Sequence, residues 1–166
     1  ATRKLLAPLQ RRVPLMEEDL RALTDGPPSS LDKAELLIDR KQPHWLMGWR
    51  DITNVTNERT VIASVFPKVG TGDKLLLTHH TRTPTAAAVF LGLMSSITLD
   101  YIARQKHSGT SLKYHFMKQF AAVEPSDFHS TDHDFIVPRV LELTYTSLAM
   151  RPWAKDLGHV GPPFGW

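Results

Sequence analysis

Three strand-like segments in close succession limit the fold of this chain more than any other feature of its sequence. Residues 45–52, 59–66 and 74–78 are rich in β-branched and aromatic side chains, which favour strands. The connections between these segments are short and contain turn-forming residues, Gly70 and Gly72 among them. Because parallel strands need a long crossover between them and antiparallel strands do not, this spacing predicts an antiparallel sheet.

A long helical pattern follows the predicted sheet, from Pro84 to Lys106. Proline is tolerated at the first helical position, and Thr83 before it is a suitable N-cap. Apolar side chains recur at spacings of three and four residues, at Val89, Phe90, Leu93, Ile97, Tyr101 and Ile102. We therefore predict one long helix that packs on the sheet.

A second helix is predicted near the C-terminus. Pro138 fits only a first helical turn, so we expect this helix to begin there. We expect Pro152 to end or kink the helix and Gly158 to stop its continuation. The expected fold class is therefore α+β, with an antiparallel sheet packed with a long helix, plus a C-terminal helix.

The composition is that of a folded protein, and the chain divides into three parts. Of the 166 residues, 42% are hydrophobic and 22% charged, which is typical of globular and not of disordered chains. We expect residues 1–42 to form a lead-in with short helices, residues 43–125 the core, and residues 126–166 a C-terminal helical extension. There is no cysteine, which excludes disulfides, and no apolar run long enough to span a membrane. We therefore expect a cytoplasmic protein without a membrane partner.

Several catalytic signatures are absent from the sequence. It contains no GxxxxGK[ST] phosphate-binding loop, no GxGxxG dinucleotide motif and no GxSxG nucleophile elbow. The neighbouring acids Glu17 and Glu18 lie on a charged helical face and give no support for glycosidase chemistry. His129, Asp132 and His133 would gather on one helical face as metal ligands, but the Ser, Thr and Asp around them favour a capped loop. We expect no catalytic residue and no metal site in this chain.

A basic elbow, residues 106–113, lies at the end of the predicted long helix. The net charge of +3 permits a nucleic-acid partner without requiring one, so the distribution of charge matters more than its total. The stretch from Arg104 to Lys118 has four basic residues, two histidines and no acidic residue. Its candidate DNA contacts are Lys106, His107, Thr110, Ser111 and Lys113. The same stretch can also be an ordinary solvated turn.

Two further segments carry side chains suited to DNA. The first contains Arg50, Asn54, Asn57 and Arg59. Arginine matches guanine and asparagine matches adenine in bidentate fashion, although asparagine also bonds its own backbone in turns. The second contains Arg82, just before the predicted long helix, where a helix N-terminus also attracts anions. A plain surface loop is the alternative there.

Three blocks of the sequence resemble the C-terminal part of large adenine-specific DNA methyltransferases of type IIG-like restriction-modification and related phage-defence systems. The blocks are residues 45–77, 90–125 and 134–166, in the order in which the family has them. The most distinctive stretches are RDITNVTNERT at residues 50–60 and LDYIARQKHSGTSLKYHFMKQF at residues 99–120.

The resemblance implies a target recognition domain, which reads a DNA sequence on behalf of a catalytic domain. The catalytic domain of such enzymes binds S-adenosylmethionine through a Gly-containing motif and holds the adenine with an NPPY-type motif, and neither motif occurs here. The expected partners are therefore double-stranded DNA and the missing methyltransferase domain. We expect no cofactor in this chain, S-adenosylmethionine on the missing domain, and no catalysis by the chain alone.

Two other classes of function stay open on the sequence alone. A protein-interaction or scaffold module would dock a catalytic subunit through the C-terminal helix, with Tyr145, Met150 and Trp153 suited to the interface. A stand-alone hydrolase using histidine and aspartate would need a pocket that gathers these side chains. The sequence gives no reason to expect such a pocket.

Overall fold

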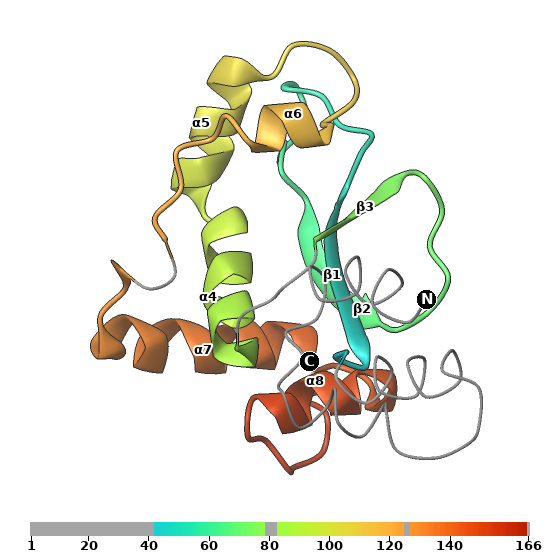
Figure 1. The fold of residues 1–166 in the computed structure, drawn as a ribbon, viewed down its shortest axis with the longest axis vertical. Helices are drawn as coiled ribbons and strands as arrows, with labels where there is room; N and C mark the ends of the chain where they lie inside the picture. The colour runs from blue at the N-terminus through green and yellow to red at the C-terminus, as the bar shows by residue number, and fades with distance from the viewer. Residues whose placement is uncertain (1–41, 79–82, 125–126, 166) are drawn as a thin grey trace, which may run out of the picture. The chain divides into compact units, whose positions relative to one another are not determined.

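The computed structural model describes residues 42–78, 83–124 and 127–165. The chain divides into two units, residues 1–43 and residues 44–166. The short helices expected before residue 42 lie outside the described part of the chain. The second unit combines a three-stranded antiparallel sheet with helices (Figure 1), which confirms the predicted α+β class.

The strand with the largest aromatic side chains lies at the centre of the sheet. Strands β1 (Trp45–Arg50), β2 (Ala63–Pro67) and β3 (Leu75–Thr78) have the order β2-β1-β3, and both pairs are antiparallel. Side chains of β1 alternate between the two faces, and those of Trp45, Met47 and Trp49 are buried. All three predicted strands are present, each somewhat shorter than expected.

The predicted long helix is two helices, which corrects the expectation of one. Helix α4 (Pro84–Met94) begins as predicted, with the Thr83 hydroxyl accepting a hydrogen bond from the backbone N–H of Ala86. Helix α5 (Ile97–Lys106) follows at a bend of 61°. The break occurs because Ser96 adopts an extended conformation and its hydroxyl caps α5 by accepting from the backbone N–H of Leu99.

The C-terminal helix begins eight residues earlier than Pro138, which was predicted as its first turn. Helix α7 (Ser130–Thr144) contains that proline in its interior. The His129 backbone N–H donates to the Asp132 carboxylate, and this capping interaction starts the helix upstream of the proline. The predicted start at Pro138 was wrong because it rested on the proline and not on this cap.

The predicted C-terminal extension also continues differently after α7. A 3-10 helix, η2 (Leu148–Met150), leads into helix α8 (Arg151–Asp156), in which Pro152 occupies the first turn. This proline therefore helps to start a helix and does not end one, because its fixed φ angle suits that position. Gly158, at φ +83°, follows the end of α8 as predicted.

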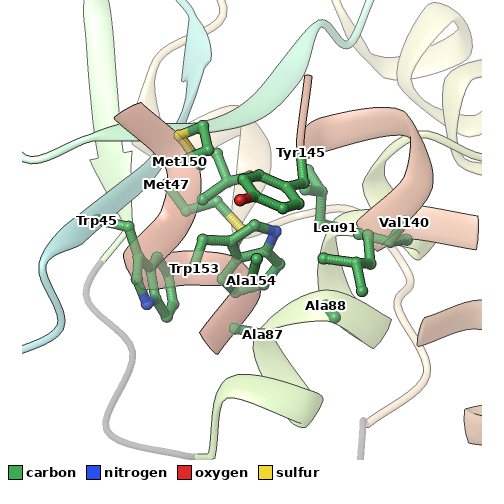
Figure 2. Close-up of a cluster of buried hydrophobic side chains, with 12 residues drawn as sticks. Trp45, Met47, Ala87, Ala88, Leu91, Val140, Tyr145, Met150, Trp153 and Ala154 are labelled. Atoms are coloured by element: carbon green, nitrogen blue, oxygen red, sulfur yellow. The ribbon is translucent and has the colours of Figure 1, made fainter. Parts of the chain in front are cut away.

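One hydrophobic core joins the sheet to α4, α7 and α8 (Figure 2). The rings of Trp45 and Trp153 meet edge to face with centroids 4.6 Å apart. Tyr145, Met150 and Trp153 are buried in this core, so they do not line the interface that the alternative function assigned to them. Gly92 of α4 faces Ile136 of α7, and a Cβ atom at this glycine would lie 2.7 Å from the isoleucine. The small residue thus lets these two helices approach closely.

A second core lies toward the other end of β1 and supports the elbow. It gathers Trp49, Val61, Met94, Leu99, Ala103, Leu112 and Phe120. The segment after the elbow forms the short helix α6 (Tyr114–Met117). Figure 1 shows α6, the elbow and the loop after β1 at the same end of this unit.

Candidate nucleic-acid interface

The elbow pairs directly with the chain that continues from β1. Ile52 forms an antiparallel bridge with Ser111, and the backbone N–H of Thr53 donates to the carbonyl of Thr110 at 3.1 Å. On the other side of the bridge, Leu112 N–H donates to the Asp51 carbonyl at 2.7 Å. Two segments that the sequence proposed as separate DNA contacts are therefore hydrogen-bonded to each other.

The elbow is anchored at its end and exposed in its middle. Leu112 is fully buried, and its carbonyl accepts a 2.7 Å hydrogen bond from the Trp49 indole N–H. Gly109 has a φ angle of +121°, which favours glycine, and it allows the tight reversal after α5. Thr110 is exposed and Ser111 half-buried, so the middle of the elbow faces solvent.

Asparagines organise the loop between β1 and β2. The side-chain oxygen of Asn54 accepts from the backbone N–H of Thr56 at 3.1 Å, and Asn57 N–H donates to the Asn54 carbonyl at 3.0 Å. The Asn57 amide donates to the Thr53 hydroxyl at 3.4 Å. The turn-forming role that was the alternative for these asparagines is therefore present, and both side chains are half-buried.

Asp100 fixes the far end of the same loop, a role that our sequence reasoning missed. One of its carboxylate oxygens accepts from the backbone N–H groups of Thr60 and Val61, each at 2.8 Å. The other accepts from the Arg104 guanidinium at 2.9 Å. The spacing of four residues between Asp100 and Arg104 in a helix was the sequence signal that could have revealed the pair.

The surroundings of Asp100 keep it ionised. Its burial alone would raise the pKa of the carboxyl group. The hydrogen bonds from Val61 N–H, Arg104 and Thr60 N–H outweigh this effect and hold the pKa below its ordinary value. Asp100 is thus a buried anion whose hydrogen bonds join α5 to the loop.

Two arginines complete the support of this loop. Arg104 also donates to the carbonyls of Val55, at 3.0 Å, and of Asn57, at 2.8 Å, and it contacts the Glu58 carbonyl. Arg59 donates to the Ser95 and Ser96 carbonyls at the α4–α5 break, and its Nε lies 3.7 Å from Asp100. The predicted DNA contact Arg59 therefore has internal partners for its guanidinium.

A fully buried carboxylate lies where the elbow meets the sheet. Oδ2 of Asp51 is 2.7 Å from the Lys113 ammonium and 3.9 Å from the Lys74 ammonium. Its other oxygen, Oδ1, has no hydrogen-bond partner within the described part of the chain. Lys74 was not among the predicted contacts. Asp73 also binds it, at 3.0 Å, and this hydrogen bond lowers the pKa of Asp73 and raises that of Lys74.

The remaining predicted contacts differ in exposure. Arg50 and Lys106 are exposed, and each donates to a backbone carbonyl, of Ile52 and Gln119 respectively. His107 is only 4% exposed, and its ring meets Phe116 edge to face. The histidine is therefore an interior residue of the elbow. The predicted contact Arg82 lies outside the described residues.

The stretch considered for metal binding forms the capped first turn of α7. His129 and Asp132 serve as its N-cap and third residue and form a capping box. Within residues 42–78, 83–124 and 127–165, no group of three His, Asp or Glu side chains is arranged to hold a metal ion.

Comparison with known proteins adds no assignment to this geometry. No protein family, curated protein or solved structure matches the chain. In the described ranges no single helix is long and apolar enough to cross a membrane, and the pair α4 and α5, which has the length and composition, is bent by 61°.

Proposed function

We propose that this chain is a sequence-specific DNA recognition domain of a restriction-modification adenine methyltransferase, whose catalytic domain is not part of it. The observation that carries the proposal is the pairing of the elbow with the loop after β1, through Ile52 and Ser111. Together these segments form the elbow surface, defined by Arg50, Asn54, Lys106, Thr110, Ser111 and Lys113. It corresponds to the two stretches that most resemble the methyltransferase family.

The chemistry of the elbow surface suits DNA. Arg50, Lys106 and Lys113 provide cations for phosphates, and phosphate contacts set the register of a protein on the duplex. The hydroxyls of Thr110 and Ser111 can donate to and accept from base edges. A rigid support is required for base reading, and the buried Leu112 and the Asp100 network supply it.

The buried histidine and Arg59 have a supporting role in this proposal. His107 packs under the elbow, and Arg59 ties the loop to the α4–α5 break. The protein uses no cofactor of its own, and S-adenosylmethionine binds to the separate catalytic domain. The partners are double-stranded DNA and that domain, in the cytoplasm.

Single substitutions on the elbow surface test the proposal. Arg50→Ala and Lys106→Ala each remove a cation that, among the described residues, donates one exposed side-chain hydrogen bond to a backbone carbonyl. Folding stability should therefore change by no more than about 0.5 kcal/mol. Each should lower the salt dependence of binding to mixed-sequence duplex DNA by about one unit of log–log slope.

Lys155→Ala is the matched control, because this exposed lysine lies on α8, near the opposite end of β1 from the elbow. It should leave the slope unchanged. The slopes come from fluorescence anisotropy titrations at several salt concentrations. Equal slopes for all four proteins would refute the elbow surface as the DNA contact.

The alternative function, a module that docks a catalytic subunit, is favoured by one observation. Phe135 and Leu143 on α7 and Leu148 on η2 are 58%, 66% and 69% exposed, which is high for large apolar side chains. Under this alternative the wild-type chain binds no duplex DNA even at low salt, and a double variant, Phe135→Ser with Leu143→Ser, would abolish co-elution with a separately expressed methyltransferase domain. Co-elution that survives both substitutions would reject this docking face.

A further inference from the structure

Asp51 is an unusual residue in a domain that is proposed to bind DNA. Its side chain is fully buried, and one carboxylate oxygen lacks a partner among the described residues. Burial of a charged group costs several kcal/mol unless partners offset it. A negative charge beside a DNA-binding surface would also repel phosphates. A folding role alone gives no reason for a carboxylate here, since an apolar residue would avoid both costs.

The backbone of Asp51 joins the two segments that carry its lysine partners. Its N–H donates to the Lys74 carbonyl at 2.9 Å, and its carbonyl accepts from the N–H of Leu112, the residue before Lys113. The side chain then faces both ammonium groups from one oxygen, at 2.7 Å for Lys113 and 3.9 Å for Lys74. One residue thus sets the place of two lysines that are far apart in sequence.

Both lysines keep much of their side chains in solvent. The Lys74 side chain is 60% exposed and the Lys113 side chain 43% exposed. Lysine side chains are long and mobile, and fixing two of them costs conformational entropy at the moment of binding. A buried carboxylate that hydrogen-bonds the Lys113 ammonium and lies 3.9 Å from the Lys74 ammonium reduces this cost.

We propose that Asp51 is a positioning residue, which holds Lys74 and Lys113 as a paired contact for phosphates of the DNA backbone. This inference rests on the proposed DNA-binding function and adds Lys74 to the elbow surface. Lysine binds phosphate as a compact point charge, and two such charges around one oxygen atom lie close enough to share one phosphate or two neighbours. The exposed Asp73, which also pairs with Lys74, competes with the phosphate.

Two isosteric substitutions distinguish positioning from simple charge effects. If only net charge mattered, Asp51→Asn and Asp73→Asn would both strengthen binding to DNA, since each removes a negative charge. The proposal predicts opposite signs. Asp73→Asn tightens binding several-fold, whereas Asp51→Asn weakens it and lowers the salt slope by between about one and two. Asp51→Asn that binds as tightly as the wild type, or more tightly, overturns the proposal.

A double-mutant comparison separates positioning from a merely structural role. In a Lys74→Ala/Lys113→Ala background, Asp51 has lost both partners shown in the structure. Adding Asp51→Asn there should no longer weaken DNA binding, and it should raise the thermal unfolding temperature by removing an uncompensated buried charge. If Asp51→Asn weakens DNA binding in this background too, its role is structural and the proposal is wrong.

Lys74→Ala keeps the proposal testable should Asp51→Asn fail to fold. This lysine is mostly exposed, and its removal leaves the 2.7 Å contact between Lys113 and Asp51 in place. The salt slope should fall by about one, and an unchanged slope overturns the paired contact. Wild-type protein that binds no duplex DNA at low salt would instead reject the proposed function itself, so the two failures have different signatures.

Discussion

Replacement of Asp100 by alanine should destabilise the fold severely, although this residue is not one of the proposed DNA contacts. The substitution leaves the buried N–H groups of Thr60 and Val61 without their acceptor. Each unsatisfied buried group costs about 1–3 kcal/mol. The ion pair with Arg104 adds less, because that side chain is 31% exposed and the pair is partly screened by solvent.

The expected loss is therefore about 3–5 kcal/mol of unfolding free energy, a large part of the usual stability of a domain. Urea unfolding followed by circular dichroism measures it. Asp134→Ala is the control, since this exposed aspartate of α7 should change the free energy by no more than about 0.5 kcal/mol. A loss below about 1 kcal/mol for Asp100→Ala would show that the loop does not depend on this carboxylate.

The same carboxylate predicts a pH dependence of stability. Its hydrogen bonds hold the folded-state pKa below the ordinary value of 3.8, so the folded protein binds this proton less readily than the unfolded chain. The stabilisation is therefore fully present above about pH 5 and declines as the pH falls through 3.8 toward the folded-state pKa. The difference in stability between the wild type and Asp100→Asn should be constant near neutral pH and shrink below about pH 4. A difference that grows on acidification would contradict the assignment.

Two further predictions concern the sheet and the core. Gly48→Ala should prevent stable folding, because the added Cβ atom would lie 2.2 Å from the Leu76 carbonyl oxygen of the neighbouring strand. Gly70→Ala is the control, since its Cβ atom would meet nothing within 4 Å, and equal melting temperatures of the two variants in thermal melts would contradict the prediction. Trp153→Ala should lower the unfolding free energy by about 3–5 kcal/mol, because this fully buried ring packs on Trp45 and its N–H donates to the Thr144 hydroxyl. A loss below about 1 kcal/mol in urea unfolding would argue against its central place in the core.

The sheet and the start of α4 could be predicted because local signals decide them. The β-branched and aromatic segments and their short connections specify three antiparallel strands, and Thr83 with Pro84 specifies a helix start. The helix break at Ser96 could not be predicted from periodicity. Apolar residues continue with helical spacing through it, and only the capping hydrogen bond to Leu99 N–H ends the pattern.

The segments of the candidate site could be proposed from the sequence, but the contacts between them could not. The basic elbow and the RDITNVTNERT stretch stand out by composition, but their pairing through Ile52 and Ser111 is a contact between residues far apart in the sequence. For the same reason the sequence could not reveal the pairing of Asp51 with Lys74 and Lys113, which are far apart along the chain. His107 looked like a surface residue because its neighbours in sequence are polar, whereas the chain reversal places it inside.

Binding of the wild-type chain to mixed-sequence duplex DNA, measured by fluorescence anisotropy from low to moderate salt, is the most direct test of the central claim. The proposed function predicts binding at low salt that weakens steeply as salt increases, because the elbow surface releases counterions from several phosphates. No binding at low salt, or binding that does not depend on salt, would contradict a DNA recognition role and favour the module that docks a catalytic subunit.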